Sequence, residues 1–370
     1  MQPIPIGQVQ LRLGQAVDAA SISAQVSAIA LDGGGHLWCG AAPLDGLLRL
    51  LPAAAGDQTA KRGASSARPG WSDPSALDLA AMLDLPNPGE PMDLTGLACA
   101  GDLLWFIGSH AGARPRPDAA LSDAQNLERL TWIEPIHRRA CLGCARVGAA
   151  RLPEPRDLAL LPIEDGGTTL TRALAEDPHL AGYFAPGPIP MAENGLELAG
   201  LGCRAGRLWI GFSGPVLGGF AVVLEVEPRE ERPCVLRLEP IGLEGRPYRK
   251  HLVDLGGRGV QGLRWQGDSL LILSGPVTDP AADPAAGQPG IYRLREASQL
   301  GADSLTLADD PRLTLLQPLT GSLQGDRPRA MERYDGLGRP GVMVVSSTLH
   351  TNRWGAADGV SAEVFPLPDI

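Results

Sequence analysis

A phrase that recurs about five times along the chain constrains the fold more than any other feature of the sequence. It begins with small residues or Gly-Leu, continues as an alternating apolar stretch, turns at Gly or Asp, and resumes with Leu-Trp or Leu-Leu. One such unit cannot bury its own apolar face, so repetition at roughly 60 to 100 residues predicts a propeller or another closed array. The copies are SAIALDGGGHLWCGA from Ser27, TGLACAGDLLWFIGS from Thr95, AGLGCRAGRLWIGFSG from Ala199, QGLRWQGDSLLILSG from Gln261 and a degraded ERYDGLGRPGVMVVSS from Glu332.

Each unit predicts a β-hairpin followed by two further strands. Apolar residues alternate on both sides of the turn, as in a half-buried hairpin. In the third unit, FAVVLEV at 220–226 and CVLRLEP at 234–240 supply the third and fourth strands of one blade. The fourth unit repeats the pattern with DSLLILS, GIYRLRE and LTLLQPL, and the second with LLWFIGS, ACLGCARVG and DLALLPI. We therefore expect an all-β chain built from four-stranded blades.

The two ends of the chain are expected to share one blade. The last unit reaches SAEVFPLP at 361–368 and lacks an outer strand, which QVQLRLG at 8–14 would supply. This closure removes open sheet edges that invite aggregation. It makes a single domain over 1–370 with five blades, whose cores start near 27, 95, 199, 261 and 332. Six blades stay open as an alternative, because the interval between the second and third units is long.

Two helices are predicted inside that long interval. Ser122 and Gln125 have capping-box spacing ahead of LERLTWI, and Thr168-Thr169 precedes LTRALAED, which stops at Pro178. Inserted loops of this kind often carry binding surfaces. A second exposed loop is predicted over 53–72, where Gly, Ser, Ala and Pro dominate.

Composition and charge restrict the class of protein and its partners. Hydrophobic residues make up 44% and charged residues 20%, as in a globular chain. A net charge of −10 argues against nucleic acid as a partner, since Lys and Arg supply phosphate affinity. The chain shows neither a signal peptide nor a membrane span, so we expect a soluble, cytoplasmic protein, unless an export signal is missing from the sequence. The six cysteines are expected to be reduced, with Cys39, Cys99 and Cys203 buried in strands.

Several segments together resemble a bacterial family of β-propeller type known as domain of unknown function 3616. They are HLWCGA, MDLTGLA with LLWFIGSHAGAR, EDPHLAGYF with IPMAENGLELAGL, SGPVLGGFAVVLEV at 213–226, YRKHLVDLGGRGVQGL and LLILSGPV. The resemblance spans about Ser27 to about Asn352 and implies a propeller of undetermined function, with no catalytic residue to carry over.

This chain departs from the family pattern mainly at charged positions. Thr95 and Ala199 stand where relatives typically have Glu, and Ser213 and Gly218 stand where they tend to have Arg. Gln261-Gly262 replaces an Arg-Asp pair. If relatives use this ring of charges for chemistry, the present chain has lost part of it.

Polar residues at equivalent points of the repeat predict a site at one end of the central channel. Inner-strand starts and inter-blade loops converge there in a propeller. The alternative is that these groups cap strand ends and satisfy backbone donors. An anionic group could be held jointly by Ser109, His110 and Arg114, whereas a serine nucleophile lacks a base aimed at it. The candidate ligand-binding residues are Ser109, His110, Arg114, Ser213, Gln261, Ser274 and Glu332.

Two further motifs favour structural roles. Cys141-Leu142-Gly143-Cys144 has redox or zinc spacing, but it falls in a strand, where the two thiols face opposite ways, and no second ligand pair follows. Gly336, Gly338 and Gly341 match the dinucleotide fingerprint, but a strand follows them instead of a helix, so they predict a hairpin turn. No protein metal site is predicted, although a calcium ion held by backbone carbonyls in the channel would leave no signature in the sequence.

The function expected from these observations is non-catalytic binding of a polar small molecule, an ion or a protein loop at the channel. Two alternatives remain. One is a metal-dependent hydrolase or lyase of the phytase-like or lactonase-like propeller kind, and the other is a protein-interaction scaffold that uses the inserted helices and the 53–72 loop.

Overall fold

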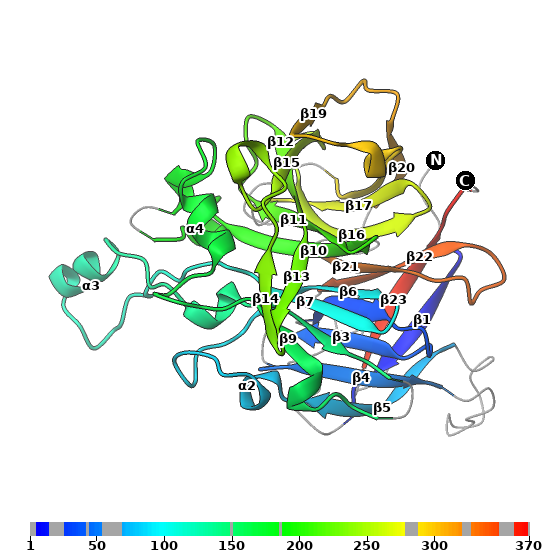
Figure 1. Cartoon of the computed structure of the whole chain (residues 1–370), viewed down its shortest axis with the longest axis horizontal. Helices are drawn as coiled ribbons and strands as arrows, with labels where there is room; N and C mark the ends of the chain where they lie inside the picture. The colour runs from blue at the N-terminus through cyan, green and yellow to red at the C-terminus, as the bar shows by residue number, and fades with distance from the viewer. Residues whose placement is uncertain are drawn as a thin grey trace.

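Short β-strands form nearly all of the regular structure in the computed structural model of the chain (Figure 1). The described α-helices have only four to seven residues each. The fold is therefore mostly β, as the sequence predicts. The structure describes residues 5–14, 26–41, 44–53, 69–148, 151–184, 187–277, 288–319, 327–347 and 359–368.

Five strands form a closed ring at the centre of the molecule. Each strand contacts the next in chain order, and the last contacts the first. The other strands pair outward from these five, so that the sheets surround a common centre in a propeller-like arrangement. The ring consists of β2 (Val26–Leu31), β6 (Leu94–Ala100), β10 (Glu197–Arg204), β16 (Gly259–Gln266) and β21 (Arg327–Arg333).

The first and last sheets are joined through the N-terminal strand. β1 (Gly7–Arg12) pairs antiparallel with β23 (Gly359–Pro366) over its whole length, which is the pairing expected for 8–14 and 361–368. On its other edge β1 pairs in parallel with β5 (Gly70–Leu77), so the two sheets become one eight-stranded sheet. The remaining strands of this sheet are β3 (Leu37–Ala41), β4 (Leu47–Pro52) and β22 (Gly341–Ser347).

β5 also corrects the loop predicted over 53–72. Residues 70–72 belong to this strand, and Trp71 is buried. Residues 54–68 lie outside the described part of the chain. The stretch from Arg333 to Gly341 joins β21 to β22 as a hairpin turn, as predicted from its glycines.

The sheet around β6 contains a strand that the sequence analysis assigned to its neighbour. CVLRLEP was predicted as the fourth strand of the third unit, but β14 (Val235–Leu238) pairs with β9 (Leu158–Leu160) of the second unit. The reason is that β15 (Arg249–Asp254) pairs along six residues of β12 (Phe220–Val226) and occupies the fourth position instead. The sheet is completed by β7 (Leu103–Gly108), β8 (Leu142–Arg146) and β13 (Pro228–Arg232).

The third sheet ends in a strand that comes from the chain segment forming the fourth sheet. β19 (Ser304–Thr306) follows β18 (Gly290–Leu294) in the chain, yet it pairs in parallel with β15 of the third sheet. The third sheet therefore has the order β10, β11 (Arg207–Gly214), β12 (Phe220–Val226), β15 and β19. The fourth has the order β16, β17 (Ser269–Gly275), β18 (Gly290–Leu294) and β20 (Leu313–Pro318).

Apolar side chains from both faces of each sheet fill the spaces between sheets. Cys141 packs with Phe106 and Trp38 in one core cluster, and Cys144 packs with Trp105 in another. The two thiols therefore occupy opposite sides of one sheet, as predicted. Both are free, and burial raises the pKa of each to about 12. These cysteines behave as packing groups.

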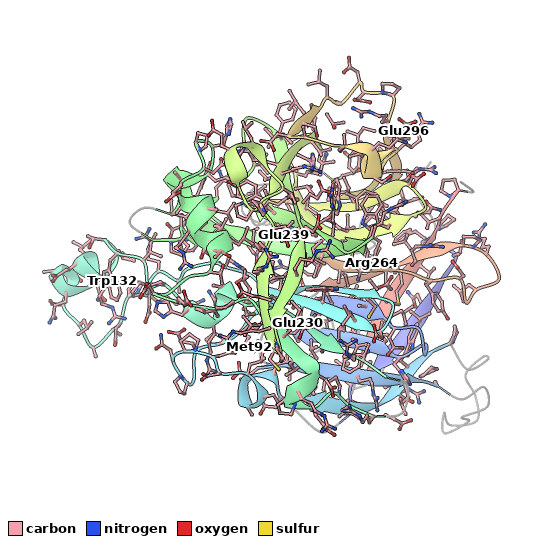
Figure 2. All side chains as sticks on the ribbon, in the orientation of Figure 1. Met92, Trp132, Glu230, Glu239, Arg264 and Glu296 are labelled. Atoms are coloured by element: carbon pink, nitrogen blue, oxygen red, sulfur yellow. The ribbon has the colours of Figure 1, made fainter. Side chains whose placement is uncertain are left out.

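The two predicted helices form where their caps indicate. α3 (Asp123–Arg129) starts after a capping box of Ser122 and Gln125, and α4 (Thr169–Ala175) starts after Thr168. α4 buries Leu170 and Leu174. α3 protrudes from the sheets (Figure 1), and Figure 2 shows Trp132 on the same protruding segment, which we call the α3 excursion.

Shorter helical turns connect the strands. α2 (Leu79–Met82) is capped by Asp78. The 3₁₀ turns are η1 (His137–Ala140), η2 (Pro155–Asp157), η3 (Ala181–Tyr183), η4 (Met191–Glu193), η5 (Leu243–Gly245) and η6 (Ala297–Gln299). Within the described ranges, no helix has the length and apolar character needed to cross a bilayer.

Candidate functional site

Most of the predicted site residues lie at the end of the ring where the inner strands begin. In three of the sheets, the inner strand pairs antiparallel with the strand that follows it in the chain. The last residues of β7, β11 and β17 therefore lie beside the first residues of β6, β10 and β16. This register brings five candidates to one level: Ser109, His110, Ser213, Gln261 and Ser274.

The three serines in this group are buried and bonded to their own surroundings. Ser274 donates to the Gly290 carbonyl at 3.1 Å and accepts from the Gly290 amide at 3.0 Å. Ser213 donates to the carboxylate of Glu197, and Ser109 accepts from the Ala111 amide at 3.4 Å. Such contacts fit the alternative in which these hydroxyls cap strand ends.

His110 is buried in an unusual backbone conformation. Its φ of 57° is left-handed, and Nδ1 lies 2.9 Å from the Gly108 carbonyl, to which it donates as a neutral ring. Nε2 is buried and has no hydrogen-bond partner among the described residues. Burial lowers the pKa of His110 to about 4, although the Gly108 carbonyl acts in the opposite direction.

Arg114 is not at the ring. Its guanidinium forms a two-point contact with Glu193 at 2.6 and 2.8 Å and donates to the Leu130 carbonyl at 2.5 Å. Arg114 therefore ties the base of the α3 excursion to η4. These contacts hold the Arg114 guanidinium to Glu193 and Leu130, and none of them involves His110, with which it was predicted to share an anion site.

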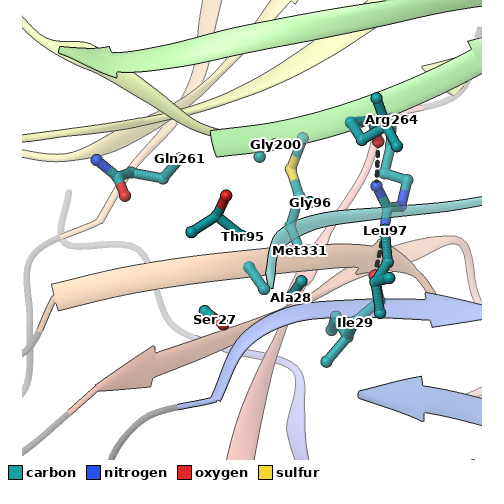
Figure 3. A pocket seen from close by; sticks show the side chains of 13 residues that line it. Ser27, Ala28, Ile29, Thr95, Gly96, Leu97, Gly200, Gln261, Arg264 and Met331 are labelled. Carbon is teal, nitrogen blue, oxygen red and sulfur yellow. Dashed lines mark hydrogen bonds between the residues drawn. The ribbon is translucent and has the colours of Figure 1, made fainter. Parts of the chain in front are cut away.

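Glu332 is also separated from the other candidates. It lies near the end of β21 and accepts from the Leu31 amide at the end of β2, at 3.1 Å. Arg264 donates to it at 2.8 Å. Arg264 also donates to the carbonyls of Leu201 and Ile29, and Figure 3 shows this arginine between the inner strands. Glu332 thus belongs to the end of the ring where the inner strands finish, and the prediction that it shares a site with His110 is wrong.

Side chains fill the interior of the ring. Figure 3 shows the cavity between the inner strands, and its volume is about 10 Å³. Ser27 donates to the Leu94 carbonyl and Thr95 to the Leu198 carbonyl, each at 2.6 Å, so the same contact links successive inner strands. A cavity of this size holds about one water molecule.

Further polar side chains form a cluster within the third sheet. In the described part of the chain, no group of three or more His, Cys, Asp or Glu side chains is arranged to hold a metal ion. Glu225 accepts from Arg207 at 2.7 Å and from Arg249 at 3.2 Å, and His251 Nδ1 lies 2.8 Å from the hydroxyl of Ser304. This cluster connects four strands of the third sheet.

A much larger cavity, which the repeated sequence pattern does not predict, lies beside the third sheet. We call it the Asp177–Lys250 pocket. It has a volume of about 620 Å³, within the range of ligand sites. Its walls come from the end of α4 and the following turn (173–179), from η5 and its neighbours (243–247), and from Lys250 of β15 and Asp303.

A buried ion pair forms the floor of this pocket. Asp177 and Lys250 are only 1% and 5% exposed, and the Lys250 ammonium donates to both Asp177 oxygens at 2.6 and 2.7 Å. Tyr248 donates to Asp177 at 2.7 Å and the His179 amide does so at 2.9 Å. Arg246 bridges Asp177 and Asp303. A buried pair needs such extra hydrogen bonds to offset its desolvation.

This network determines the protonation states of Asp177 and Tyr248. Burial alone would raise the pKa of the Asp177 carboxyl, but hydrogen bonds from Lys250, Tyr248 and the His179 amide lower it below its usual value. Burial and the Asp177 carboxylate raise the pKa of Tyr248 well above its usual range. A lowered carboxyl pKa stabilises the fold above pH 4 or so, and this stabilisation is lost as the pH falls through the folded-state value.

The rim of the pocket is acidic and exposed. Four carboxylates line the cavity, whereas only two cationic side chains do, so at neutral pH the acids outnumber the bases. Glu176, Glu244 and His179 are exposed, and the His179 side chain is 57% accessible. Floor and rim therefore differ, because the floor groups neutralise one another while the outer carboxylates face solvent.

Sequence reasoning missed this pocket because insertions build it, not the repeated phrase. Two signals were nevertheless present. EDPHLAGYF and YRKHLVDL, both quoted for the family resemblance, supply Asp177, His179 and Lys250. Lys61 and Lys250 are also the only lysines in the chain, so a lysine at 250 is itself unusual.

The fold and the pocket define a propeller-like β protein with a ligand-sized cavity beside its third sheet. The chain belongs to the family described as protein of unknown function (DUF3616), whose model matches residues 25–363. This confirms the resemblance seen in the sequence. No curated protein matches the chain.

Two solved structures illustrate the similarity at low identity. Virginiamycin B lyase from Staphylococcus aureus is 10% identical, with a TM-score of 0.37 over 98% of this chain and 99% of that one. A putative oxidoreductase (glucose dehydrogenase) from Thermus thermophilus is 13% identical, with a TM-score of 0.38 over 97% and 100% of the respective chains. Such values say nothing about activity.

Proposed function

We propose that this protein is a five-bladed propeller that binds a small polar cation in the Asp177–Lys250 pocket without transforming it. The blade count is supported by the five strands of the ring, each of which carries its own sheet outward. The pocket takes the place of the ring interior as the binding location, since the ring cavity of about 10 Å³ is far smaller than any ligand site.

One observation carries the proposed ligand class. A cavity of about 620 Å³ is lined by four carboxylates and two cationic side chains. The two cations are committed to Asp177 and Asp303, whereas Glu176 and Glu244 face solvent at the rim. An electronegative concave surface favours a positively charged ligand over a neutral or anionic one.

The floor supports binding and not chemistry. All three donors of the Lys250 ammonium are engaged by Asp177 and His179, and Asp177 accepts from several donors at once. A general acid or base must reach its substrate within hydrogen-bond distance, and these two groups have no position left to do so. Their arrangement is that of a rigid base for the pocket.

Calorimetric titration with spermidine, a flexible polyamine, tests the proposal. We expect binding to wild type that weakens with added salt. The double change Glu176→Gln with Glu244→Gln should weaken it by about 2- to 30-fold, taking each exposed charge pair as roughly 0.2–1 kcal/mol. The matched control is Glu230→Gln with Glu231→Gln, two exposed carboxylates of β13 that do not line the pocket; Figure 2 labels Glu230. Absence of binding to wild type, or equal losses in both double variants, would refute the proposal.

A further inference from the structure

The contact between Lys250 and His179 determines which nitrogen of the imidazole carries a proton. The Lys250 ammonium lies 2.9 Å from His179 Nδ1, and its other two donors go to the oxygens of Asp177. An ammonium has three donors and no acceptor, so Nδ1 must accept this hydrogen bond. In a neutral imidazole the proton then resides on Nε2.

His179 therefore offers an N–H donor to the pocket. Its ring lines the cavity and its side chain is 57% exposed, while Nδ1 is turned to buried Lys250. Nε2 is at the other edge of the ring, away from that lysine. Asp177 holds Lys250 and also accepts from the His179 amide, so the donor has a fixed backbone position as well as a fixed tautomer.

We infer that the ligand carries a neutral hydrogen-bond acceptor, such as an amide carbonyl, in addition to its cationic group. This inference rests on the proposed function. The acceptor oxygen would accept a hydrogen bond from the Nε2–H group of His179, while the cation lies near the Glu176 and Glu244 carboxylates. A carboxylate would be a poor acceptor here, since the acids of the rim would repel it. The ligand class is thus an amine that also contains an amide or similar carbonyl.

Two monocations of similar length separate this inference from the proposed function. N-acetylputrescine has an amine and an amide carbonyl, whereas hexylamine has only the amine. Wild type should bind N-acetylputrescine about 2- to 12-fold more tightly, as expected for one hydrogen bond. His179→Phe should abolish this preference but retain spermidine binding, and His179→Gln, which keeps a donor, should restore part of it. His137→Phe, a histidine outside the pocket, should leave the preference unchanged.

The tautomer gives a readout that needs no ligand. Nitrogen NMR of the His179 ring should find the proton on Nε2, and finding it on Nδ1 would overturn the inference. Equal binding of the two monocations to wild type, or a preference that persists in His179→Phe, would also overturn it. If spermidine binds in either case, the proposed function stands and only the acceptor is refuted. If spermidine fails to bind, the proposed function itself fails.

Discussion

Replacing His110 by Asn should remove about 3 kcal/mol of the stability that this fold loses between pH 7 and pH 4. His110 is 4% exposed, and its pKa of about 4 in the folded chain compares with 6.5 for an ordinary histidine. The unfolded chain therefore takes up a proton before the folded one does as the pH falls. Because the folded-state pKa is depressed, the stabilisation is complete above pH 6.5 or so and is lost as the pH approaches 4.

The expected magnitude follows from that difference in pKa. Each pKa unit corresponds to about 1.4 kcal/mol, so His110 alone should reduce the free energy of unfolding by about 2 kcal/mol between pH 7 and pH 5, and by about 3 kcal/mol by pH 4. Asn is the suitable replacement because it tolerates the left-handed φ of 57° and can still donate to the Gly108 carbonyl. It does not titrate.

Urea unfolding at pH 7, 5 and 4 provides the assay. The variant should already be less stable at pH 7 because Asn is smaller. The quantity to compare is therefore the change in the free energy of unfolding between pH 7 and pH 4. Wild type should lose about 3 kcal/mol more than His110→Asn on going to pH 4. Ser109→Ala, the neighbouring buried residue, should follow wild type. Parallel pH profiles of wild type and His110→Asn would refute the reasoning, as would an NMR titration that places the His110 pKa near its ordinary value of 6.5.

Two further predictions concern the stability of the ring. Removal of residues 1–14 takes away β1 with the buried side chains of Val9 and Leu11, so the chain should lose roughly 5 kcal/mol or more of unfolding free energy; unchanged thermal unfolding would show that β1 does not close the sheet. Glu332→Gln leaves the Arg264 charge buried without its partner and should cost about 3–5 kcal/mol, whereas Arg264→Met combined with Glu332→Leu should cost less than the sum of the two single changes. If denaturant unfolding shows that the free-energy losses of the two single changes simply add in the double variant, the coupling between Arg264 and Glu332 is contradicted.

The fold could be predicted from the sequence wherever the signal was local. The alternating phrases fall on strands, and the capping residues Ser122 and Thr168 start helices, because both signals act within a few residues of the chain. Which strand pairs with which is a non-local choice. CVLRLEP has the pattern of a strand in any sheet, and competition from β15 decided its place.

The candidate site was predicted less well, for two physical reasons. The degraded fifth phrase starts at Glu332, where its strand is about to end, so alignment by phrase placed this residue at the wrong end of the ring. The Asp177–Lys250 pocket arises from two insertions with no periodicity, brought together only by the packing of the sheets. Five of the seven candidates do share one level of the ring, but Ser109, Ser213 and Ser274 bond there to backbone groups and to a neighbouring side chain.

The pairing of β1 with both β23 and β5 has a consequence for synthesis of the chain on the ribosome. Gln10 bonds to Ser361, a partner 351 positions later in the chain. At about 5–20 residues per second, this partner emerges roughly 20 to 70 seconds after β1 does. During that interval β1 has only β5 to pair with, through two residues, and its apolar Val9 and Leu11 remain without most of their final neighbours. A slowed ribosome would lengthen this exposed period, so the yield of native protein should depend on translation speed, even when the stability of the finished fold does not change.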